Sequence, residues 1–405
     1  MKKIEVRRWI KRGVAAVIVA SVLGLAACGS DAGAPAAGDT AGGTAAGDES
    51  TGDAVGGEDA ADAADVAGGK ASDGAGADGR ASGGAGTDGK ASGDPEKKAG
   101  GTGEKKKVTF VLDWTPNTNH TGLYVAQEKG YFDEAGLEVE IVQPPEGGAE
   151  VLVASGKAQF GVSFQDTMAP ALAGDGALPI KAVAAILQHN TSGIISRKGE
   201  GMDRPKGLEG KRYATWESPV ELATLQSVVE GDGGEFEKVQ LIPNTVTDEV
   251  SALKSNLVDA IWIFYGWAGV KTELEGLETD YFAFGDLDPV FDYYTPVVIA
   301  GDRFLEEEPD TARAFLAALG KGYEEAARDP KGAADILCRA VPELDPELAL
   351  ASQEYLSGQY LADAKGWGYM DPERWDRFYS WLNEKGLVDP KLSEGIGFTN
   401  DYLPQ

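Results

Sequence analysis

The sequence predicts an α/β fold made of two similar units and completed by a helical segment. From residue 105 onward, short apolar runs typical of buried strands alternate with segments of helical periodicity. The same alternation restarts near residue 211, which indicates a second unit. Beyond about residue 307 the patterns are almost entirely helical. Strands that alternate with helices favour mainly parallel sheets with helices packed on their faces.

In the first unit, the predicted strands are apolar runs and two of the helices end at glycine. Gly130 and Gly156 follow helical patterns at the position where a left-handed residue commonly ends a helix. The predicted strands cover 108–112, 137–142, 158–163 and 180–187. The predicted helices cover 123–129, 149–155 and 168–173.

The second unit repeats this rhythm and leads into the helical segment. Its predicted strands cover 211–216, 239–242, 260–264, 281–284 and 296–300. Its predicted helices cover 219–229 and 248–255. The final helices are expected at 307–327, 330–339, 346–355 and 372–383.

Residues 1–28 have the pattern of an export signal. A basic stretch ending at Arg12 precedes an apolar run over 14–25, which is too short to span a bilayer comfortably. The ending Leu25-Ala26-Ala27-Cys28 resembles the lipobox of bacterial lipoproteins. The resemblance implies cleavage before Cys28, lipidation of its thiol and a lipid-anchored protein on the extracytoplasmic face of the cell membrane. The alternative is an ordinary signal peptide in which the cysteine occurs by chance.

Residues 29–104 are composed mainly of Gly, Ala, Asp, Ser and Thr, with a weak ten-residue repeat over 69–88. A segment with almost no large apolar side chains cannot offset the entropy lost on ordering. We therefore predict a disordered tether with a reach of roughly 45–50 Å. A role in binding a specific partner is the alternative.

Charge and cysteine usage exclude several classes of protein. The formal net charge of −29 disfavours binding to nucleic acid, whose phosphates it would repel. Cys28 and Cys338 are the two cysteines, so no disulfide framework or cysteine metal site is expected. Cys338 fits a small apolar position on a helix. Nucleophile-elbow, phosphate-loop and His-Glu-x-x-His motifs do not occur in the sequence, which favours a binding protein over an enzyme. We expect this protein to be a monomer and to need no cofactor.

Polar and aromatic residues follow several of the predicted strands. In open α/β sheets, ligands bind beyond the carboxyl ends of the strands, so these residues are expected to line one cleft. Aromatic faces there would stack on a flat ring, while carboxylates and amides would hydrogen-bond its edge. The candidate ligand-binding residues are Asp113, Trp114, Asn117, His120, Tyr124, Ser163, Gln165, Gln188, Trp216, Glu217, Ser218, Glu221, Tyr265 and Trp267.

Each candidate also has a structural interpretation, and we expect about half of them to line the cleft. Asp113 could cap a helix, and Glu221 could simply complement a helix dipole in the first turn. The face of the predicted strand 260–264 that carries Trp262 is expected to pack in the core. His120 and His189 could form a metal site only if folding joined them with a carboxylate, so ordinary polar cleft residues are favoured and no metal site is predicted.

Five segments resemble the NMT1/thiamine-pyrimidine branch of periplasmic substrate-binding proteins. They are 112–126, Gly130-Tyr131-Phe132, 188–193, 262–267 and 292–296, and the resemblance covers about 106–390. It implies a bilobal α/β fold of the type II periplasmic-binding-protein kind, with a hinge. The lobes are expected at 106–199 with 299–405, and at 200–298, with chain crossings near 199 and 298.

The resemblance also implies a function. Proteins of this branch deliver a formylated 4-amino-5-aminomethyl-2-methylpyrimidine to the permease and ATPase of an ABC importer for thiamine salvage. Binding of another heterocycle such as riboflavin is an alternative. A related enzyme branch makes the thiamine pyrimidine and carries a Gly-x-Lys-x-x-x-His segment and a cysteine-rich motif. This chain has Ser163 and Thr167 in place of the Lys and His and lacks the cysteines, which argues against the enzyme.

Overall fold

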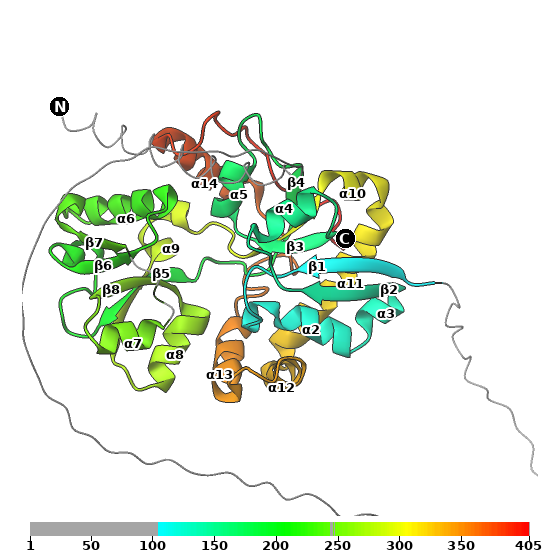
Figure 1. The fold of residues 1–405 in the computed structure, drawn as a ribbon, viewed down its shortest axis with the longest axis horizontal. Coiled ribbons are helices and arrows are strands. Elements are labelled where there is room, and N and C mark those ends of the chain that lie inside the picture. Colours follow the sequence, from blue (N-terminus) through cyan, green and yellow to red (C-terminus); the bar gives the residue numbers. More distant parts are fainter. Residues whose placement is uncertain (1–103, 244–245, 247, 405) are drawn as a thin grey trace, which may run out of the picture. The chain divides into compact units, whose positions relative to one another are not determined.

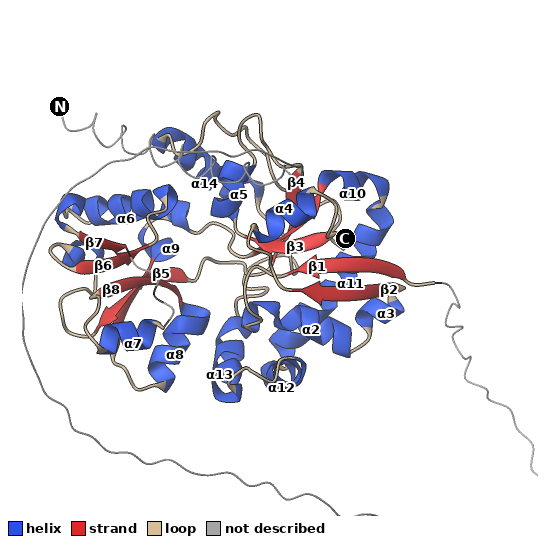
Figure 2. Ribbon diagram, in the orientation of Figure 1, coloured by secondary structure: helices blue, strands red, loops and turns tan. Residues whose placement is uncertain are grey.

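The computed structural model describes residues 104–243, 246 and 248–404, which form two five-stranded sheets with helices packed on them (Figures 1 and 2). The predicted signal peptide, Cys28 and the predicted tether up to residue 103 lie outside the described residues. Within those residues, no helix has the length and apolar character needed to cross a membrane.

The first sheet has the strand order β2-β1-β3-β10-β4. Its strands are β1 (Lys106–Val111), β2 (Leu137–Val142), β3 (Phe160–Ser163), β4 (Ile180–Ala185) and β10 (Val297–Gly301). β1 pairs in parallel with β2 and β3, whereas β10 runs antiparallel to β3 and β4. We call this sheet and its helices the first lobe.

The second sheet repeats this arrangement with the order β7-β6-β8-β5-β9. Its strands are β5 (Ser192–Arg197), β6 (Arg212–Thr215), β7 (Gln240–Pro243), β8 (Ala260–Phe264) and β9 (Thr279–Ala283). β6 is parallel to β7 and β8, and β5 is antiparallel to β8 and β9. We call this sheet and its helices the second lobe.

Two sequence-based expectations need correction. Each sheet is mixed rather than mainly parallel, because β5 and β10 enter from the opposite lobe and therefore run in the reverse direction. The first crossing occupies 186–191 and not the region near 199, since the unpredicted strand β5 already belongs to the second sheet. The second crossing occupies 284–296, directly before β10.

The helices follow the predicted pattern closely, with short additional turns. The first-lobe helices before the crossing are α2 (Thr121–Glu128), α3 (Tyr131–Glu134), α4 (Gly148–Ala154) and α5 (Gln165–Ala171). The second lobe and the second crossing contain α6 (Pro219–Gly231), α7 (Glu249–Lys254), α8 (Val270–Leu274) and α9 (Phe284–Leu287). The C-terminal helices are α10 (Asp302–Glu307), α11 (Pro309–Arg328), α12 (Pro330–Ala340), α13 (Pro346–Ser357) and α14 (Pro372–Lys385).

The start of each of the last three helices is encoded by an Asp-Pro pair. Asp329, Asp345 and Asp371 each accept hydrogen bonds from backbone N–H groups of the first turn, and proline occupies the first helical position. An aspartate cap satisfies donors that would otherwise have no partner, and proline has no N–H to lose there. These local signals set the starts of the last three helices.

The first sheet is packed on both faces. On one face, the Phe160 and Phe315 rings stack with centroids 4.1 Å apart, which anchors α11 to the sheet. Gly122 on α2 and Gly322 on α11 allow these helices to touch, because a Cβ on Gly322 would lie 2.0 Å from the Gly122 carbonyl oxygen. The close contact fixes α2, and with it the loop that connects β1 to α2.

Candidate functional site

The loop after β1 holds a carboxylate in a defined position. The Asn117 backbone N–H donates to His120 Nδ1 at 3.1 Å, so the ring proton of a neutral imidazole must lie on Nε2. Nε2 then donates to Asp113 Oδ1 at 2.7 Å. His120 is completely buried, while the Asp113 side chain keeps 11% of its exposure. No hydrogen bond from a described residue reaches Asp113 Oδ2, so this oxygen can accept one from a ligand.

Three buried hydroxyl groups from the C-terminal segment hold the same loop. Tyr323 donates to the Asn119 carbonyl at 2.7 Å, and Tyr360 donates to the Thr118 carbonyl at 2.7 Å. The Thr118 hydroxyl lies 2.5 Å from the hydroxyl of Ser352 on α13. The sequence could not indicate these supports, because they come from residues more than two hundred positions away.

Two tryptophans with large exposed faces follow strands of different sheets. Trp114 follows β1 and is 59% exposed, and Trp216 follows β6 and is 53% exposed. The Trp216 ring is supported by Trp262 at 5.8 Å between centroids, and Trp262 packs on Phe284 at 4.1 Å. Trp262 is thus core, as expected, while each lobe presents one exposed aromatic surface at a strand end.

Glu221 holds the turn that carries Trp216. Its carboxylate accepts hydrogen bonds from the Tyr213 hydroxyl at 2.7 Å, the Trp216 N–H at 3.1 Å and the Ser218 N–H at 3.2 Å. The side chain is buried, and burial raises its pKa although these hydrogen bonds oppose the shift. With Ser218 it forms the capping box of α6. Its oxygens are therefore occupied within the protein.

Glu217 lies beside Trp216 and is exposed. Its backbone adopts φ 59°, a left-handed conformation that is uncommon for residues other than glycine. The Thr215 hydroxyl accepts the Glu217 N–H at 2.9 Å and helps to hold this conformation. The Glu217 carboxylate is thus placed in solvent next to an exposed aromatic face.

The amides of Gln165 and Gln188 are used for packing. Gln165 is completely buried; its Nε2 donates to the Trp375 carbonyl and its Oε1 accepts the Tyr294 N–H, each at 2.9 Å. Gln188 Nε2 donates to the Tyr369 carbonyl at 3.1 Å. Both residues thus join the strand ends to the C-terminal segment.

The end of β3 carries a polar cluster. The Ser163 hydroxyl donates to the Glu150 carboxylate. Burial raises the pKa of nearby Asp166 to about 6, against the lowering effect of backbone hydrogen bonds and the Tyr293 hydroxyl. Between Ser163 and Asp166, the Phe164 ring stacks against Phe264 at 6.3 Å, which brings the ends of β3 and β8 together across the two lobes.

The end of β8 forms a π-helical turn, Tyr265–Gly269. Tyr265 donates to the Glu273 carboxylate and packs between Tyr281 and Tyr355, at 4.7 and 5.3 Å between centroids. Trp267, in the same turn, is half-buried. Such turns often occur at functional sites.

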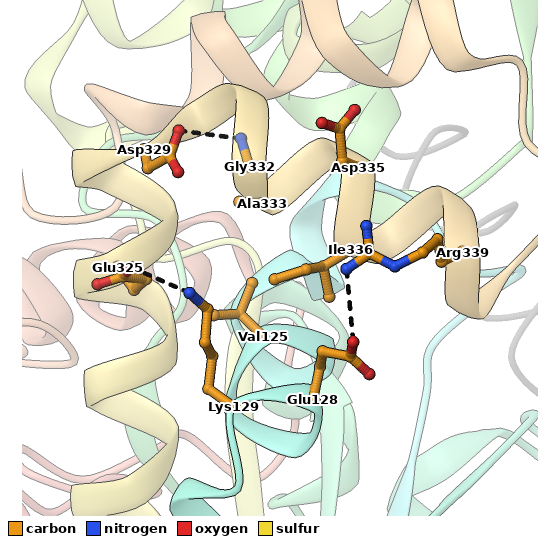
Figure 3. A pocket seen from close by; sticks show the side chains of 10 residues that line it. All are labelled: Val125, Glu128, Lys129, Glu325, Asp329, Gly332, Ala333, Asp335, Ile336 and Arg339. Carbon is orange, nitrogen blue, oxygen red and sulfur yellow. Dashed lines mark hydrogen bonds and ion pairs between the residues drawn. The ribbon is translucent and has the colours of Figure 1, made fainter.

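Tyr124 lies apart from the other candidates. It lines a hollow with Lys107, Thr109 and Glu138, on the face of the β1–β2 pair and not at the strand ends. A second hollow, between α2, α11 and α12, is bridged by ion pairs of Lys129 with Glu325 and Arg339 with Glu128 and contains none of the candidates (Figure 3).

The two chain crossings are joined by a charged network that the sequence did not indicate. His189 Nδ1 lies 2.9 Å from Asp292 Oδ2, and the Arg374 guanidinium lies 2.8 Å from Asp292 Oδ1. The Asn190 N–H also donates to Asp292 at 2.9 Å. His120 and His189 take part in separate networks, and no group of three or more metal-ligating side chains occurs among the described residues.

Comparison with known proteins relates the chain to two kinds of relative. The sequence profile of a family described as "NMT1/THI5 like" matches residues 117–333. The formylaminopyrimidine-binding protein of Halalkalibacterium halodurans is 32% identical, over 71% of this chain and 88% of that protein. The 4-amino-5-hydroxymethyl-2-methylpyrimidine phosphate synthase THI13 of Saccharomyces cerevisiae is 25% identical, over 73% of this chain and 88% of that enzyme.

The fold is also found among solved structures. The periplasmic aliphatic sulphonate binding protein SsuA of Escherichia coli matches with a TM-score of 0.57 at 15% identity, over 71% of this chain and 95% of SsuA. The two-lobed α/β fold expected from the sequence is therefore confirmed as that of periplasmic binding proteins, with mixed sheets in both lobes.

Proposed function

The chain belongs to the NMT1/THI5-like family, and from this premise we propose that it is the solute-binding component of an ABC importer. The proposed ligand is N-formyl-4-amino-5-aminomethyl-2-methylpyrimidine, bound between the lobes. The observation that carries the proposal is the Asp113 carboxylate, which neutral His120 fixes beside the exposed Trp114.

The chemistry of an aminopyrimidine fits these groups. The exocyclic amino group is a hydrogen-bond donor, and Asp113 Oδ2 is an acceptor that its own loop leaves available. The flat ring needs aromatic faces, which Trp114 and Trp216 offer from the two lobes. A hydrogen bond to a carboxylate is stronger than one between neutral groups.

Binding is favoured over synthesis of the pyrimidine by the contacts of Ser163. The synthase relative shows that the family also contains enzymes. In this chain Ser163 stands at the position of the lysine, and a serine offers no amine for covalent chemistry. Its side chain is also buried and hydrogen-bonded to Glu150. No cofactor is part of the proposal.

The proposal includes the cellular context. Lipidation at Cys28 would anchor the protein on the extracytoplasmic face of the membrane, and the segment 29–104 would act as a tether. The permease and ATPase of the importer would be its partners. The ligand is supported by the formylaminopyrimidine-binding protein of Halalkalibacterium halodurans, which is 32% identical over 71% of this chain.

Calorimetry with the formylaminopyrimidine on the full chain tests the ligand. We expect a one-to-one complex, and mass spectrometry of protein purified under native conditions should release the same compound. The absence of binding at high micromolar ligand would overturn the pyrimidine assignment. A different heterocycle in the mass spectrum, such as riboflavin, would keep the binding function and replace its ligand.

A further inference from the structure

A short chain of buried hydroxyl groups connects the β1 loop to the second lobe. Ser352 on α13 donates to the carbonyl oxygen of Gly266, in the π-helical turn after β8. Since its single proton is used there, Ser352 must accept the hydrogen bond from the Thr118 hydroxyl, 2.5 Å away. Thr118 is almost completely buried, and Ser352 completely so. Water therefore cannot readily replace these contacts.

α13 is part of the first lobe, although it touches the second. Leu356 on α13 belongs to the core cluster of the first sheet, and Gln353 on the same helix donates to the Ala326 carbonyl of α11 at 3.3 Å. The contact with the second lobe is close, because a Cβ on Gly266 would lie 2.7 Å from Leu356 Cδ2. Tyr355 adds a ring contact to Tyr265 across the same junction.

A rotation of the lobes must separate these groups. Thr118 and Ser352 would stay with the first sheet, while Gly266 would move with β8 about the crossings at 186–191 and 284–296. The hydrogen bond from Ser352 to Gly266 can therefore exist only in a narrow range of lobe orientations. The same Ser352 hydroxyl bonds the loop that positions Asp113 through His120.

We infer that Ser352 is a positioning residue that couples the ligand loop of the first lobe to closure of the second lobe. The inference rests on the proposed function as far as the ligand is concerned, but the coupling of the lobes is a property of the protein alone. With Ser352 in place, the β1 loop and the π-helical turn after β8 are held in fixed relative positions. Ligand release therefore requires the hydrogen bond from Ser352 to Gly266 to break.

Ser352→Ala is compared with Tyr379→Phe. Each removes one buried hydroxyl of the first lobe, and each should lower the melting temperature. The Tyr379 hydroxyl donates to the Gln165 carbonyl at 3.1 Å, within the first lobe, whereas the Ser352 hydroxyl bonds both the β1 loop and the second lobe. We therefore expect release of formylaminopyrimidine to accelerate on the order of tenfold in Ser352→Ala and to stay near the wild-type rate in Tyr379→Phe. Equal acceleration in both variants would overturn the inference.

A measurement without ligand separates this inference from the proposed function. Nitroxide labels at Val151→Cys in the first lobe and Leu257→Cys in the second, in a full chain with Cys28 and Cys338 replaced by serine, report the distance between lobes. Both positions are more than half exposed. The distance distribution should shift or broaden in Ser352→Ala and in Gly266→Ala, which disturbs the same junction from the other side, but not in Tyr379→Phe. Unchanged distributions in both junction variants would overturn the coupling, whether or not the wild type binds the pyrimidine.

Discussion

Replacing Asp113 with asparagine should weaken binding of the aminopyrimidine while leaving the β1 loop folded. Asparagine keeps an oxygen that can accept the His120 Nε2–H, now 2.7 Å from Asp113 Oδ1. The His120 tautomer is fixed independently by the Asn117 N–H. The substitution therefore changes mainly the second oxygen, which becomes an amide donor facing the amino group of the ligand.

The size of the effect follows from this change at one atom. A polar group left without a partner in a buried complex costs about 1–3 kcal/mol, which corresponds to roughly 5- to 150-fold in the dissociation constant. Thermal unfolding should change little, since no hydrogen bond within the protein is lost. Calorimetry measures the affinity, and differential scanning fluorimetry measures the stability.

Glu217→Gln provides the control for removing a carboxylate near the site. Glu217 is exposed, and no hydrogen bond to its side chain is seen among the described residues. The Glu217→Gln variant should bind the aminopyrimidine with an affinity within about twofold of the wild type, because exposed charges contribute little to the energy of an interaction. If Asp113→Asn bound the ligand normally but melted at a lower temperature, Asp113 would be a structural cap of the loop, and our account of ligand recognition would be refuted.

Three further predictions concern stability and location. Glu221→Gln should lower the free energy of unfolding by about 1–3 kcal/mol in denaturant titrations, because an amide N–H would face groups that donate to the carboxylate; unchanged stability would contradict this. The hydrogen bond to Asp292 raises the pKa of His189, so its stabilising effect should be complete below about pH 6.5 and decrease as pH rises through the higher folded pKa. The difference in melting temperature between wild type and His189→Gln should therefore shrink at alkaline pH, and a difference that grew would refute the role of this pair. Cys28→Ala should move the protein from washed membranes to the soluble fraction, and retention in the membranes would exclude the lipid anchor.

Local signals in the sequence predicted most of the fold. β2 and β8 were placed at their observed bounds, because each is an apolar or alternating run between clear turn residues. β5 was missed, since five of its six residues are buried and Ser192-Gly193 at its start breaks both alternation and apolar continuity. Its antiparallel direction, and that of β10, depends on the path between lobes, which no local pattern records.

The candidate site was predictable only in part, for a similar reason. Asp113 and His120 are seven residues apart, so their pairing lies within one loop that the sequence already singled out. Gln165 and Gln188 looked equally suitable, but their partners Trp375 and Tyr369 lie more than 180 residues further along the chain. A polar residue at a strand end can serve either ligand or packing, and distant partners decide which.

The strand order has a consequence for how the protein is made. β3 and β4 are consecutive in the chain, but they are not neighbours in the sheet, because β10 lies between them. During synthesis the first sheet cannot close until the ribosome has finished the whole second lobe, whereas 192–283 supply all five strands of the second sheet without interruption. The first lobe begins to leave the ribosome before the second lobe does. The second lobe is nevertheless the one that can complete its sheet first.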